Sequence, residues 1–403
     1  MNALAASVAS ACQIPLSTVE TSNKLHDYIL LGMRSEASGA TDNNTTVVVE
    51  SKNDDSQSDA DEEDLIPGYK MRLEFQNDVK YETKHAPNYN TWYITTHKEA
   101  ARCAAFSPDG RFIATGSEDT SLKILDVTKM NLRSDAEDKP VIRTLYDHLQ
   151  PVTEVAFHPN NLMLASCALD NNIKLYDLTK VGVKKAFRYL LDSHPFRSIS
   201  FHPSGDFLLA GTEDDRVRMY DIKTITSFVP LDSSRNHKGP ITSVRFGPNG
   251  RLFVTSGEDG SIRIWDGVNM RCERVIEGAH NGHEVCSVRI SKNGKYLLSS
   301  GKDSEPKLWD LGSGKVIQKY IGATQNNFPI QVAFDYAEDF VLGGDEPSSS
   351  IFVWDTKTGE VVKKLSGHNS VASYIASSPV EGCFISCSED HRARYWKIGD
   401  LEA

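Results

Sequence analysis

Cysteine is scarce in this sequence of 403 residues, and its placement excludes the chemistry that cysteine clusters serve. The seven cysteines are scattered and odd in number, and the closest pair, Cys383 and Cys387, does not form a C-x-x-C motif. The pattern has neither the spacing of a zinc site nor that of a disulfide framework. We therefore expect reduced cysteines that fill small spaces in a core, and we expect no metal and no cofactor.

Long hydrophobic runs are also missing. No stretch of about 18 apolar residues occurs, which excludes a predicted membrane-spanning helix. The first residues, MNALA, carry neither a basic region nor a long apolar segment, so no secretory signal is expected. A phosphate-binding G-x-x-x-x-G-K motif is absent, and no unrepeated cluster of histidines, cysteines or paired carboxylates stands out. We therefore expect no enzymatic activity.

Basic residues are fewer than acidic residues, and the excess of acidic residues is local. The net charge of −11 is concentrated in residues 41–64, which hold nine acidic side chains and only one basic side chain. Residues 65–403 are close to neutral, so the electrostatic footprint of a nucleic-acid-binding protein is lacking, and we expect no sequence-specific RNA binding. A small basic group, Lys184, Lys185 and Arg188, is interpreted as a solvated loop face.

What the sequence does contain is a repeat. The segment TSGEDGSIRIWDG, which starts at Thr255, recurs with a few substitutions along most of the chain. The position of its closing Asp is occupied in turn by Asp126, Asp177, Asp221, Asp266, Asp310, Asp355 and Lys397. Most of these positions are 42 to 45 residues apart, and the first interval is 51. A period of this length that ends in Trp-Asp is the signature of WD repeats, in which each repeat forms one four-stranded propeller blade.

Seven repeats predict an all-β fold, a seven-bladed WD-repeat β-propeller. Short alternating apolar segments indicate strands, and turns such as SPDG from Ser107 and GPNG from Gly247 separate them. The last blade lacks a strand after Trp396, and residues 89–94 before the first repeat supply it. Such closure hides sheet edges that otherwise invite aggregation. We expect the propeller over residues 88–397 and a short tail over residues 398–403.

Most repeats also combine a histidine, a hydroxyl and an aspartate. His97, His148, His237 and His368 each precede an aspartate by 22 residues, whereas His194 precedes Asp214 by 20 residues. For the fifth repeat, both His280 and His283 are candidates. We expect a buried structural network made of His97, Ser117, Asp119, His148, Asp170, His194, Thr212, Asp214, His237, Ser256, Asp259, Trp265, Ser300, Asp303, Trp309, His368, Ser388, Asp390 and Trp396.

A catalytic triad uses the same three residue types. Six copies in one chain do not represent six active sites, and a buried Asp or His must be hydrogen-bonded in any case. The sixth repeat lacks both the His and the Asp at these offsets and has PSSS from Pro347 instead. We therefore expect its blade to be less tightly held.

The region before the propeller divides into two parts. Residues 1–34 contain two short apolar segments that indicate helices, the second capped by Asn23 and ended by Gly32. Helices this short are marginal alone and need a partner. Residues 35–87 are rich in acids, Ser, Asn and Thr, and we expect a disordered linker because they bury too little apolar surface.

Specific phrases between the repeats carry a family resemblance. They are residues 142–148 (IRTLYDH), 186–189 (AFRY), 197–207 (RSISFHPSGDF) and 298–304 (LSSGKDS). As an ordered set they resemble the WD-repeat subunits of cleavage stimulation factor over residues 95–396. The segment 25–33 is similar to the end of that family's N-terminal self-association domain, of which residues 1–34 are then a remnant. The earlier helices of that domain are not found here.

The resemblance implies a noncatalytic, nuclear scaffold or adaptor subunit that acts in pre-mRNA 3′-end cleavage and polyadenylation. It also implies that the propeller binds the helical-repeat scaffold subunit of the complex. Contacts with the RNA polymerase II C-terminal domain and self-association through the N-terminus are further implied. The family's geometry points the residues just before each repeat Asp, and two strand arginines, toward the rim of the channel. The expected partner-binding residues are Arg102, Glu118, Leu169, Arg197, Glu213, Glu258, Lys302 and Glu389.

Four acids in this ring favour a basic or proline-rich partner segment. The alternative is a substrate receptor or adaptor of another nuclear complex, such as a ubiquitin ligase. Such receptors usually have an Arg two residues after the Asp of a Trp-Asp pair. Here the corresponding residues are Val268, Gly312 and Lys357. The marker is absent, so the scaffold role is preferred.

Overall fold

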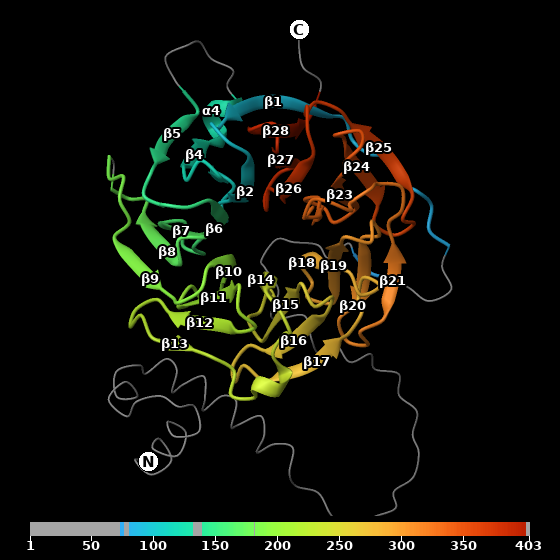
Figure 1. Ribbon diagram of the computed structural model, residues 1–403. Helices are drawn as coiled ribbons and strands as arrows, with labels where there is room; N and C mark the ends of the chain where they lie inside the picture. Colours follow the sequence, from blue (N-terminus) through green and yellow to red (C-terminus); the bar gives the residue numbers. More distant parts are fainter. Residues whose placement is uncertain (1–72, 76–79, 132–138, 181, 400–403) are drawn as a thin grey trace, which may run out of the picture. The chain divides into compact units, whose positions relative to one another are not determined.

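The computed structural model describes residues 73–75, 80–131, 139–180 and 182–399 (Figure 1). Its strands belong to one compact unit, which comprises residues 71–267 and 271–403. They form seven antiparallel sheets of four strands each, so the predicted seven-bladed β-propeller is confirmed. The helices predicted within residues 1–34 and the acidic stretch 41–64 lie outside the described residues.

The blades follow one another along the chain, and each runs from an inner to an outer strand. Blade 1 consists of β2 (Ala101–Phe106), β3 (Phe112–Ser117), β4 (Leu122–Asp126) and β5 (Val141–Leu145). Blade 2 consists of β6 (Val152–Phe157), β7 (Met163–Ala168), β8 (Asn172–Asp177) and β9 (Arg188–Leu191). Blade 3 consists of β10 (Phe196–Phe201), β11 (Phe207–Thr212), β12 (Val217–Asp221) and β13 (Ser227–Phe228). Blade 4 consists of β14 (Ile241–Phe246), β15 (Leu252–Gly257), β16 (Ile262–Asp266) and β17 (Cys272–Ile276).

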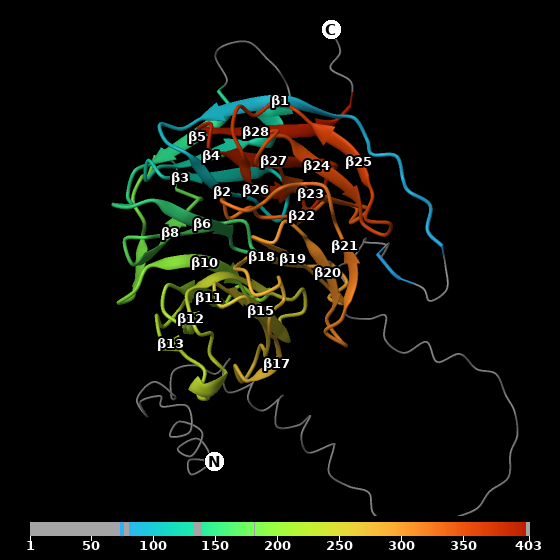
Figure 2. The ribbon, with the colours of Figure 1, turned by 45° about the vertical axis from the view of Figure 1, so that its right-hand side comes forward.

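The remaining blades complete the ring, which Figure 2 shows from a second direction. Blade 5 consists of β18 (Val285–Ile290), β19 (Tyr296–Gly301), β20 (Lys307–Asp310) and β21 (Val316–Lys319). Blade 6 consists of β22 (Ala333–Phe334), β23 (Phe340–Gly344), β24 (Ile351–Asp355) and β25 (Val361–Leu365). Blade 7 consists of β26 (Ala372–Ser377), β27 (Cys383–Ser388), β28 (Arg392–Ile398) and β1 (Tyr89–Thr96). The inner strands of neighbouring blades pack together around the centre of Figure 1.

The ring is closed by the strand that comes first in the sequence. β1 pairs antiparallel with β28, from Tyr89 opposite Ile398 to Thr96 opposite Arg392. Tyr89 is buried, and its ring meets Phe384 of β27 edge-to-face with centroids 5.1 Å apart. The prediction that the segment before the first repeat completes the last blade is confirmed, and blade 7 is built from both ends of the propeller.

The core lies between the blades. One cluster joins blades 7, 1 and 2, a second joins blades 2 and 3, and others join blades 4 and 5, 5 and 6, and 6 and 7. Strand residues with consecutive buried positions, such as all six of β11 and β19, fit this arrangement because both faces of a blade contact a neighbouring blade. Each of these apolar clusters is therefore shared by at least two repeats.

Glycine is required in the turns between the first two strands of several blades. Gly110, Gly205, Gly250 and Gly294 have φ values of +72°, +81°, +71° and +69°. Side chains rarely adopt this left-handed conformation, and a Cβ on Gly250 would meet the His202 Nε2 atom at 2.1 Å. This geometry explains the recurring Pro-x-Gly turns of the sequence.

The segment before β1 is held against the propeller, contrary to the disorder expected for residues 35–87 as a whole. Leu73 is buried in the cluster between blades 5 and 6, and Phe75 packs edge-to-face on Tyr296 with centroids 5.4 Å apart. The backbone N–H of Lys84 donates to Asp355 at 2.9 Å. The composition of residues 35–87 did not predict these contacts, because two apolar residues are enough to hold a short segment against the propeller.

Helix is nearly absent from the described residues. They contain the five-residue helix α4 (Val127–Asn131) and the single turn η1 (Ser233–Arg235). In this part of the chain, no helix is long and apolar enough to cross a membrane.

Candidate functional site: buried histidine networks and a charged rim

Five blades contain a buried histidine that bridges an aspartate and a hydroxyl. In blade 2, His148 Nδ1 lies 2.9 Å from Asp170 Oδ2, and its Nε2 lies 2.7 Å from Ser166 Oγ. In blade 4, His237 Nδ1 lies 3.1 Å from Asp259 Oδ1, and its Nε2 lies 2.8 Å from Thr255 Oγ1. Each network ties the loop that enters a blade to the hairpin between its second and third strands.

Blades 5, 7 and 1 repeat this arrangement with small differences. His280 Nδ1 lies 2.7 Å from Asp303, and this selects His280 over His283 as the histidine of the fifth repeat. His368 Nδ1 lies 3.0 Å from Asp390 Oδ2. In blade 1, Ser121 Oγ comes between the partners: it lies 3.0 Å from His97 Nδ1, which is 3.7 Å from Asp119.

The hydroxyl in these networks is not the one expected. It stands four residues before the aspartate in all five blades, whereas hydroxyls two or three residues before it were predicted. The hydroxyl residues that contact a histidine Nε2 are Thr115, Ser166, Thr255, Ser299 and Ser386. For Ser256 and Ser300, a shift of one residue puts the hydroxyl on the other face of the strand, because side chains alternate. Ser117 and Ser388, shifted by two residues, lie at the end of the strand, beyond reach of the imidazole. The constant spacing of four was the signal in the sequence.

The predicted hydroxyls make other contacts. Ser117 Oγ and Ser388 Oγ donate to the backbone carbonyls of Glu99 and Ser370, at 3.3 and 3.0 Å. Ser256 Oγ lies 2.8 Å from Thr242 Oγ1, and Ser300 Oγ lies 2.8 Å from Ser287 Oγ, both on inner strands. They fasten the second strand of a blade to its surroundings and do not contact the imidazole.

Tryptophan extends the histidine network in blades 4, 5 and 7. The Nε1–H groups of Trp265, Trp309 and Trp396 donate to the same hydroxyls that contact the histidines, at 2.9, 2.8 and 2.8 Å. An ionised aspartate only accepts hydrogen bonds, so the histidine Nδ1–H donates to it. The Nε2 atom of a neutral imidazole then accepts from the hydroxyl, which in turn accepts from the tryptophan. The network is neutral at the imidazole and fully satisfied.

Burial controls the protonation of these groups. Desolvation lowers the pKa of His97 to about 4, with Lys123 adding to the effect and Asp119 opposing it. Desolvation also lowers the pKa values of His237, His280 and His368. Burial alone would raise the pKa of Asp303, but hydrogen bonds from His280 and Lys307 outweigh it and hold this pKa well below its usual value.

Blade 3 replaces the histidine with an arginine. His194 is half-exposed and lies 3.5 Å from Asp214, so it does not enter a buried network. Instead Arg218 Nη1 donates to Thr212 Oγ1 at 2.8 Å, and the Arg218 guanidinium makes two bonds of 2.9 Å to the Asp214 carboxylate. The expected role of His194 is thus corrected: the bidentate guanidinium, which comes from β12, takes the position that imidazole holds elsewhere.

Blade 6 lacks the histidine network but retains an anchored aspartate. Asp345 accepts from the backbone N–H groups of Thr324 and Ser348, at 2.8 and 3.0 Å. Gln325 is buried and donates to the carbonyl of Gly344 at 3.0 Å. Its inner strand β22 has only two residues. The blade is the most irregular of the seven, yet its entering loop is tied to its hairpin by a different set of bonds.

The predicted partner-binding residues lie at equivalent positions of the ring. In every blade the residue at the hairpin tip donates its backbone N–H to a carbonyl of the entering segment. The acceptor is the residue just before the inner strand except in blade 6, where Thr324 stands nine residues before β22. The pairs are Glu118 with Ala100, Leu169 with Pro151, Glu213 with Pro195, Glu258 with Pro240, Lys302 with Glu284, Glu346 with Thr324, and Glu389 with Val371. Glu346 completes the set, and it was missed because blade 6 has one extra residue between this position and Trp354.

The charges of this rim are largely paired with each other. Arg102 Nη2 lies 2.5 Å from Glu118, and Arg102 also contacts Glu389 of blade 7. Arg197 lies 3.3 Å from Glu213 and 2.6 Å from Glu258 of blade 4. Each arginine sits at a β-bulge near the start of its inner strand, which turns the side chain out of the ladder. The structure thus brings the predicted acids together in pairs around a guanidinium.

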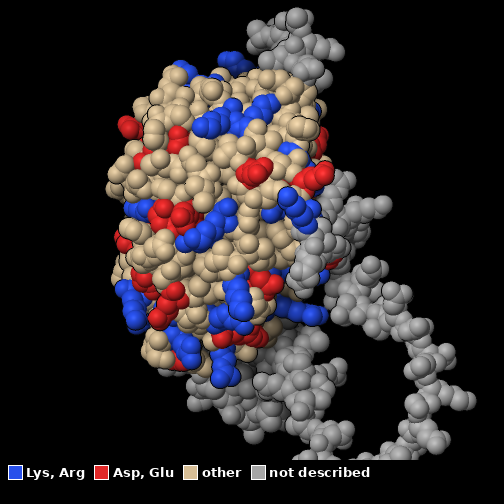
Figure 3. Space-filling view, turned by 90° about the vertical axis from the view of Figure 1, so that its right-hand side faces the viewer, with Lys and Arg blue, Asp and Glu red and all other residues tan. Residues whose placement is uncertain are grey.

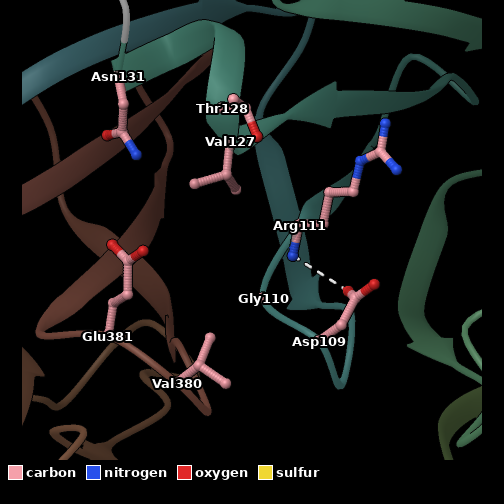
Figure 4. Close-up of a pocket in the computed structure, with 8 residues that line it drawn as sticks. All are labelled: Asp109, Gly110, Arg111, Val127, Thr128, Asn131, Val380 and Glu381. Atoms are coloured by element: carbon pink, nitrogen blue, oxygen red, sulfur yellow. Dashed lines mark hydrogen bonds between the residues drawn. The ribbon is translucent and has the colours of Figure 1, made fainter.

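A cavity and the outer wall of the ring are two further surfaces of the propeller. A cavity of ≈ 530 Å³ lies between blades 1 and 7 and is lined by residues that include Arg111, Val127 and Glu381 (Figure 4). Its Asp109 carboxylate accepts from the backbone of Arg111 at 3.0 Å. None of the predicted site residues lines this cavity. On the outer wall seen in Figure 3, acidic and basic side chains are interspersed.

The closed seven-bladed ring with its repeated networks defines the class of WD-repeat β-propeller proteins. The family model "WD domain, G-beta repeat" matches residues 89–126, 139–177, 186–221, 228–266, 270–310 and 359–397. These ranges cover six of the seven repeats and leave out most of blade 6. The transcriptional corepressor LEUNIG_HOMOLOG of Arabidopsis thaliana is 28% identical over 306 residues, which are 73% of this chain and 35% of that protein.

A second relative resembles nearly the whole chain. "Cleavage stimulation factor subunit 50" of Arabidopsis thaliana is 37% identical over 402 residues, which cover 98% of this chain and 92% of the relative. GID complex subunit 7 of Schizosaccharomyces pombe is 33% identical over only 92 residues, 22% of this chain and 18% of that protein. The chain therefore belongs to the cleavage stimulation factor subunit 50 family, as its resemblance predicted.

Proposed function

We propose that the chain is a noncatalytic, nuclear subunit of the machinery for pre-mRNA 3′-end cleavage and polyadenylation, and that its propeller binds other proteins. The observation that supports this most is the 37% identity with a cleavage stimulation factor subunit along 98% of the chain. The partner we propose is the helical-repeat scaffold subunit of that complex. Contacts with the polymerase II C-terminal domain and self-association through the N-terminus belong to the same proposal.

The geometry of the His-Ser/Thr-Asp sets supports a structural role for them. The five hydroxyls, exemplified by Thr255 and Ser386, are fully buried, so no substrate can reach them. Their hydrogen bonds are used within the protein, and an imidazole whose pKa is lowered by burial stays neutral. We propose that these networks position the hairpins that carry the rim residues.

The rim supports protein binding of a specific kind. Five glutamates stand at the seven equivalent hairpin tips, against one lysine and two neighbouring arginines. Because each arginine is shared by two glutamates, one carboxylate in each pair keeps acceptor capacity for a basic partner segment. Glu213 and Glu258 remain about one third exposed, so a partner can reach both.

A second surface suits the same partner. Large apolar side chains are exposed where the outer strand of blade 2 approaches the loop after β5. They are Tyr146, Leu149, Phe187, Tyr189 and Leu191, exposed by 61%, 81%, 48%, 42% and 72%. The Tyr189 hydroxyl lies 3.3 Å from Asp147, which places the two groups side by side. We call these five residues the outer patch, because exposed apolar side chains that gather in one region suit a protein interaction site.

The experiment compares three variants of the full chain in pull-downs of the purified scaffold subunit. The rim variant is E213A/E258A, the patch variant is L149D/L191D, and Ile321→Asp is the control because Ile321 is an exposed apolar residue outside both surfaces. We expect the control to bind normally and at least one of the other two to lose about tenfold or more in affinity.

Two results would overturn the proposal. One is undiminished binding by both variants while the control also binds. The other is recovery of cullin adaptors, and no cleavage-factor subunits, when the full chain is purified from nuclear extract.

A further inference from the structure

The inner strands bring a polar cluster into the central channel, and this cluster is unrelated to the rim. Its members come from six of the seven blades, which encircle the axis in Figure 1. We call it the channel cluster, and it consists of Glu154, Ser198, Arg245, Arg289, Gln331 and Tyr374. The Glu154 to Tyr374 contact joins strands 220 residues apart and crosses between blades 2 and 7.

One arginine of the channel cluster is neutralised. Glu154 is buried, and its carboxylate accepts from Arg245, from the Tyr374 hydroxyl at 3.1 Å and from the backbone N–H of Ile199 at 2.9 Å. Although burial by itself raises the pKa of Glu154, the attraction of Arg245 outweighs it and lowers this pKa. Glu154 and Arg245 therefore form a buried ion pair of zero net charge.

The other arginine has no carboxylate partner among the described residues. Arg289 Nη2 donates to Gln331 Oε1 at 2.9 Å and to the Tyr374 hydroxyl at 3.2 Å, and both acceptors are neutral. The Tyr374 hydroxyl in turn donates to Glu154, so Arg289 is linked to that carboxylate only through a phenol. Burial, and then the charge of Arg245, lower the pKa of Arg289. The cluster thus carries one uncompensated positive charge in a desolvated place.

The seven-fold repeat shows that neither arginine is needed to build the inner strand. The next-to-last residue of β14 and β18 is Arg245 and Arg289, each paired with the second strand of its blade. In the other five blades the residue at this register is small. It is Ala105, Ala156, Ser200, Ala333 or Ala376. Two guanidinium groups therefore stand at a register where the other five blades have only methyl or hydroxymethyl groups.

We propose that Arg289, beside the neutral Glu154–Arg245 pair, forms an anion site in the central channel that takes a compact oxyanion of the phosphate or sulfate class. Both Nη2 hydrogens of Arg289 are taken by Gln331 and Tyr374, but its Nη1 makes only a 3.4 Å contact with the Val288 carbonyl and can donate to an oxygen of such an anion. Part of the site is accessible to solvent, because the Arg245 side chain keeps 15% of its surface and Arg289 is not fully buried. An isolated buried charge is unfavourable, and an anion relieves this cost. The inference goes beyond the proposed function and does not depend on it.

Thermal unfolding of the full chain tests this site with inorganic phosphate as the probe. Titration is carried out at constant ionic strength against chloride, and sulfate and acetate are tested in parallel. We expect a saturable rise of the melting temperature with phosphate and with sulfate, and a smaller one with acetate. The Arg289→Ala variant should lose the saturable response, and alanine is suitable because four blades carry it at this register.

A surface variant and a second substitution complete the test. Arg216→Ala removes the same charge from an exposed side chain and should respond to phosphate as the natural chain does. If Arg289→Ala does not fold, Arg289→Met keeps the length of the side chain without its charge. Equal responses of the natural chain and the Arg289 variant would overturn the proposal, as would a response that never saturates. An acetate response as strong as that to phosphate would overturn the assigned class of anion.

Discussion

At the scale of single residues, the sequence predicted which residue types meet but not every partner. The spacing of 22 residues identified four of the histidine and aspartate pairs, and the structure brings all four together. The hydroxyl was misplaced because several serines and threonines stand near each aspartate, and only the pleat of β15 decides whether Thr255 or Ser256 faces the imidazole. His194 was misassigned because Arg218, outside the expected pattern, reaches its aspartate.

The choice between the two hydroxyls of β15 can be measured. Thr255→Val keeps the shape of the side chain but leaves His237 Nε2 and Trp265 Nε1 without their shared partner. Two unsatisfied buried groups should cost about 3 kcal/mol in the free energy of unfolding. Ser256→Ala, which removes one bond to Thr242, should cost about 1 kcal/mol. Urea unfolding gives both values, and equal costs would contradict the observed network.

The pH dependence of stability follows from His97. Its pKa is lowered from 6.5 to about 4 by burial, so between these values the unfolded chain binds a proton that the folded chain does not. Stability should therefore be fully present above pH 6.5 and fall as the pH drops toward 4, by about 3 kcal/mol for this group. Urea unfolding at several pH values measures the slope. His97→Asn, which does not titrate, should unfold more easily at pH 7 and show a shallower slope.

At the scale of elements, strand order and turns were predictable because each repeat carries the same apolar pattern and the same glycine turns. Blade 6 was harder, because it lacks the histidine and has one extra residue before Trp354. Its ties through Asp345 and Gln325 depend on backbone groups that no motif marks. The anchoring of Leu73 was missed for a related reason, since it depends on the apolar cluster between blades 5 and 6, which are far from Leu73 in the sequence.

The closing strand β1 offers a matched pair of substitutions. Tyr89 is buried against Phe384, whereas Ile94 in the same strand is 39% exposed. Tyr89→Ala should lower the free energy of unfolding by about 3 to 5 kcal/mol because it leaves a cavity in the shared layer. Ile94→Ala should change it by less than about 1 kcal/mol. Urea unfolding of the full chain compares the two, and similar losses would argue against closure through β1.

At the scale of the whole molecule, ring closure was the most predictable property, because seven repeats and one leading strand determine it together. The distribution of charge was less predictable. The sequence indicated an acidic rim, but Arg102 and Arg197 each join glutamates from two neighbouring blades. The pairing of Arg102 with Glu389 appears only when the first and last repeats meet. The same holds for the channel cluster, whose members are spread over 220 residues of sequence. Contacts between distant repeats carry no local signal.

Closure also predicts how the molecule unfolds. Every apolar layer is shared by two blades and the ring has no free end, so loss of one blade exposes both of its neighbours. A substitution in blade 4, such as Thr255→Val, should therefore lower the hydrogen-exchange protection of β15 and of the distant β27 by the same factor. Mass spectrometry after exchange in mild denaturant measures both strands. A fall in protection confined to blade 4 would show that the blades open one at a time, as in an open array of repeats.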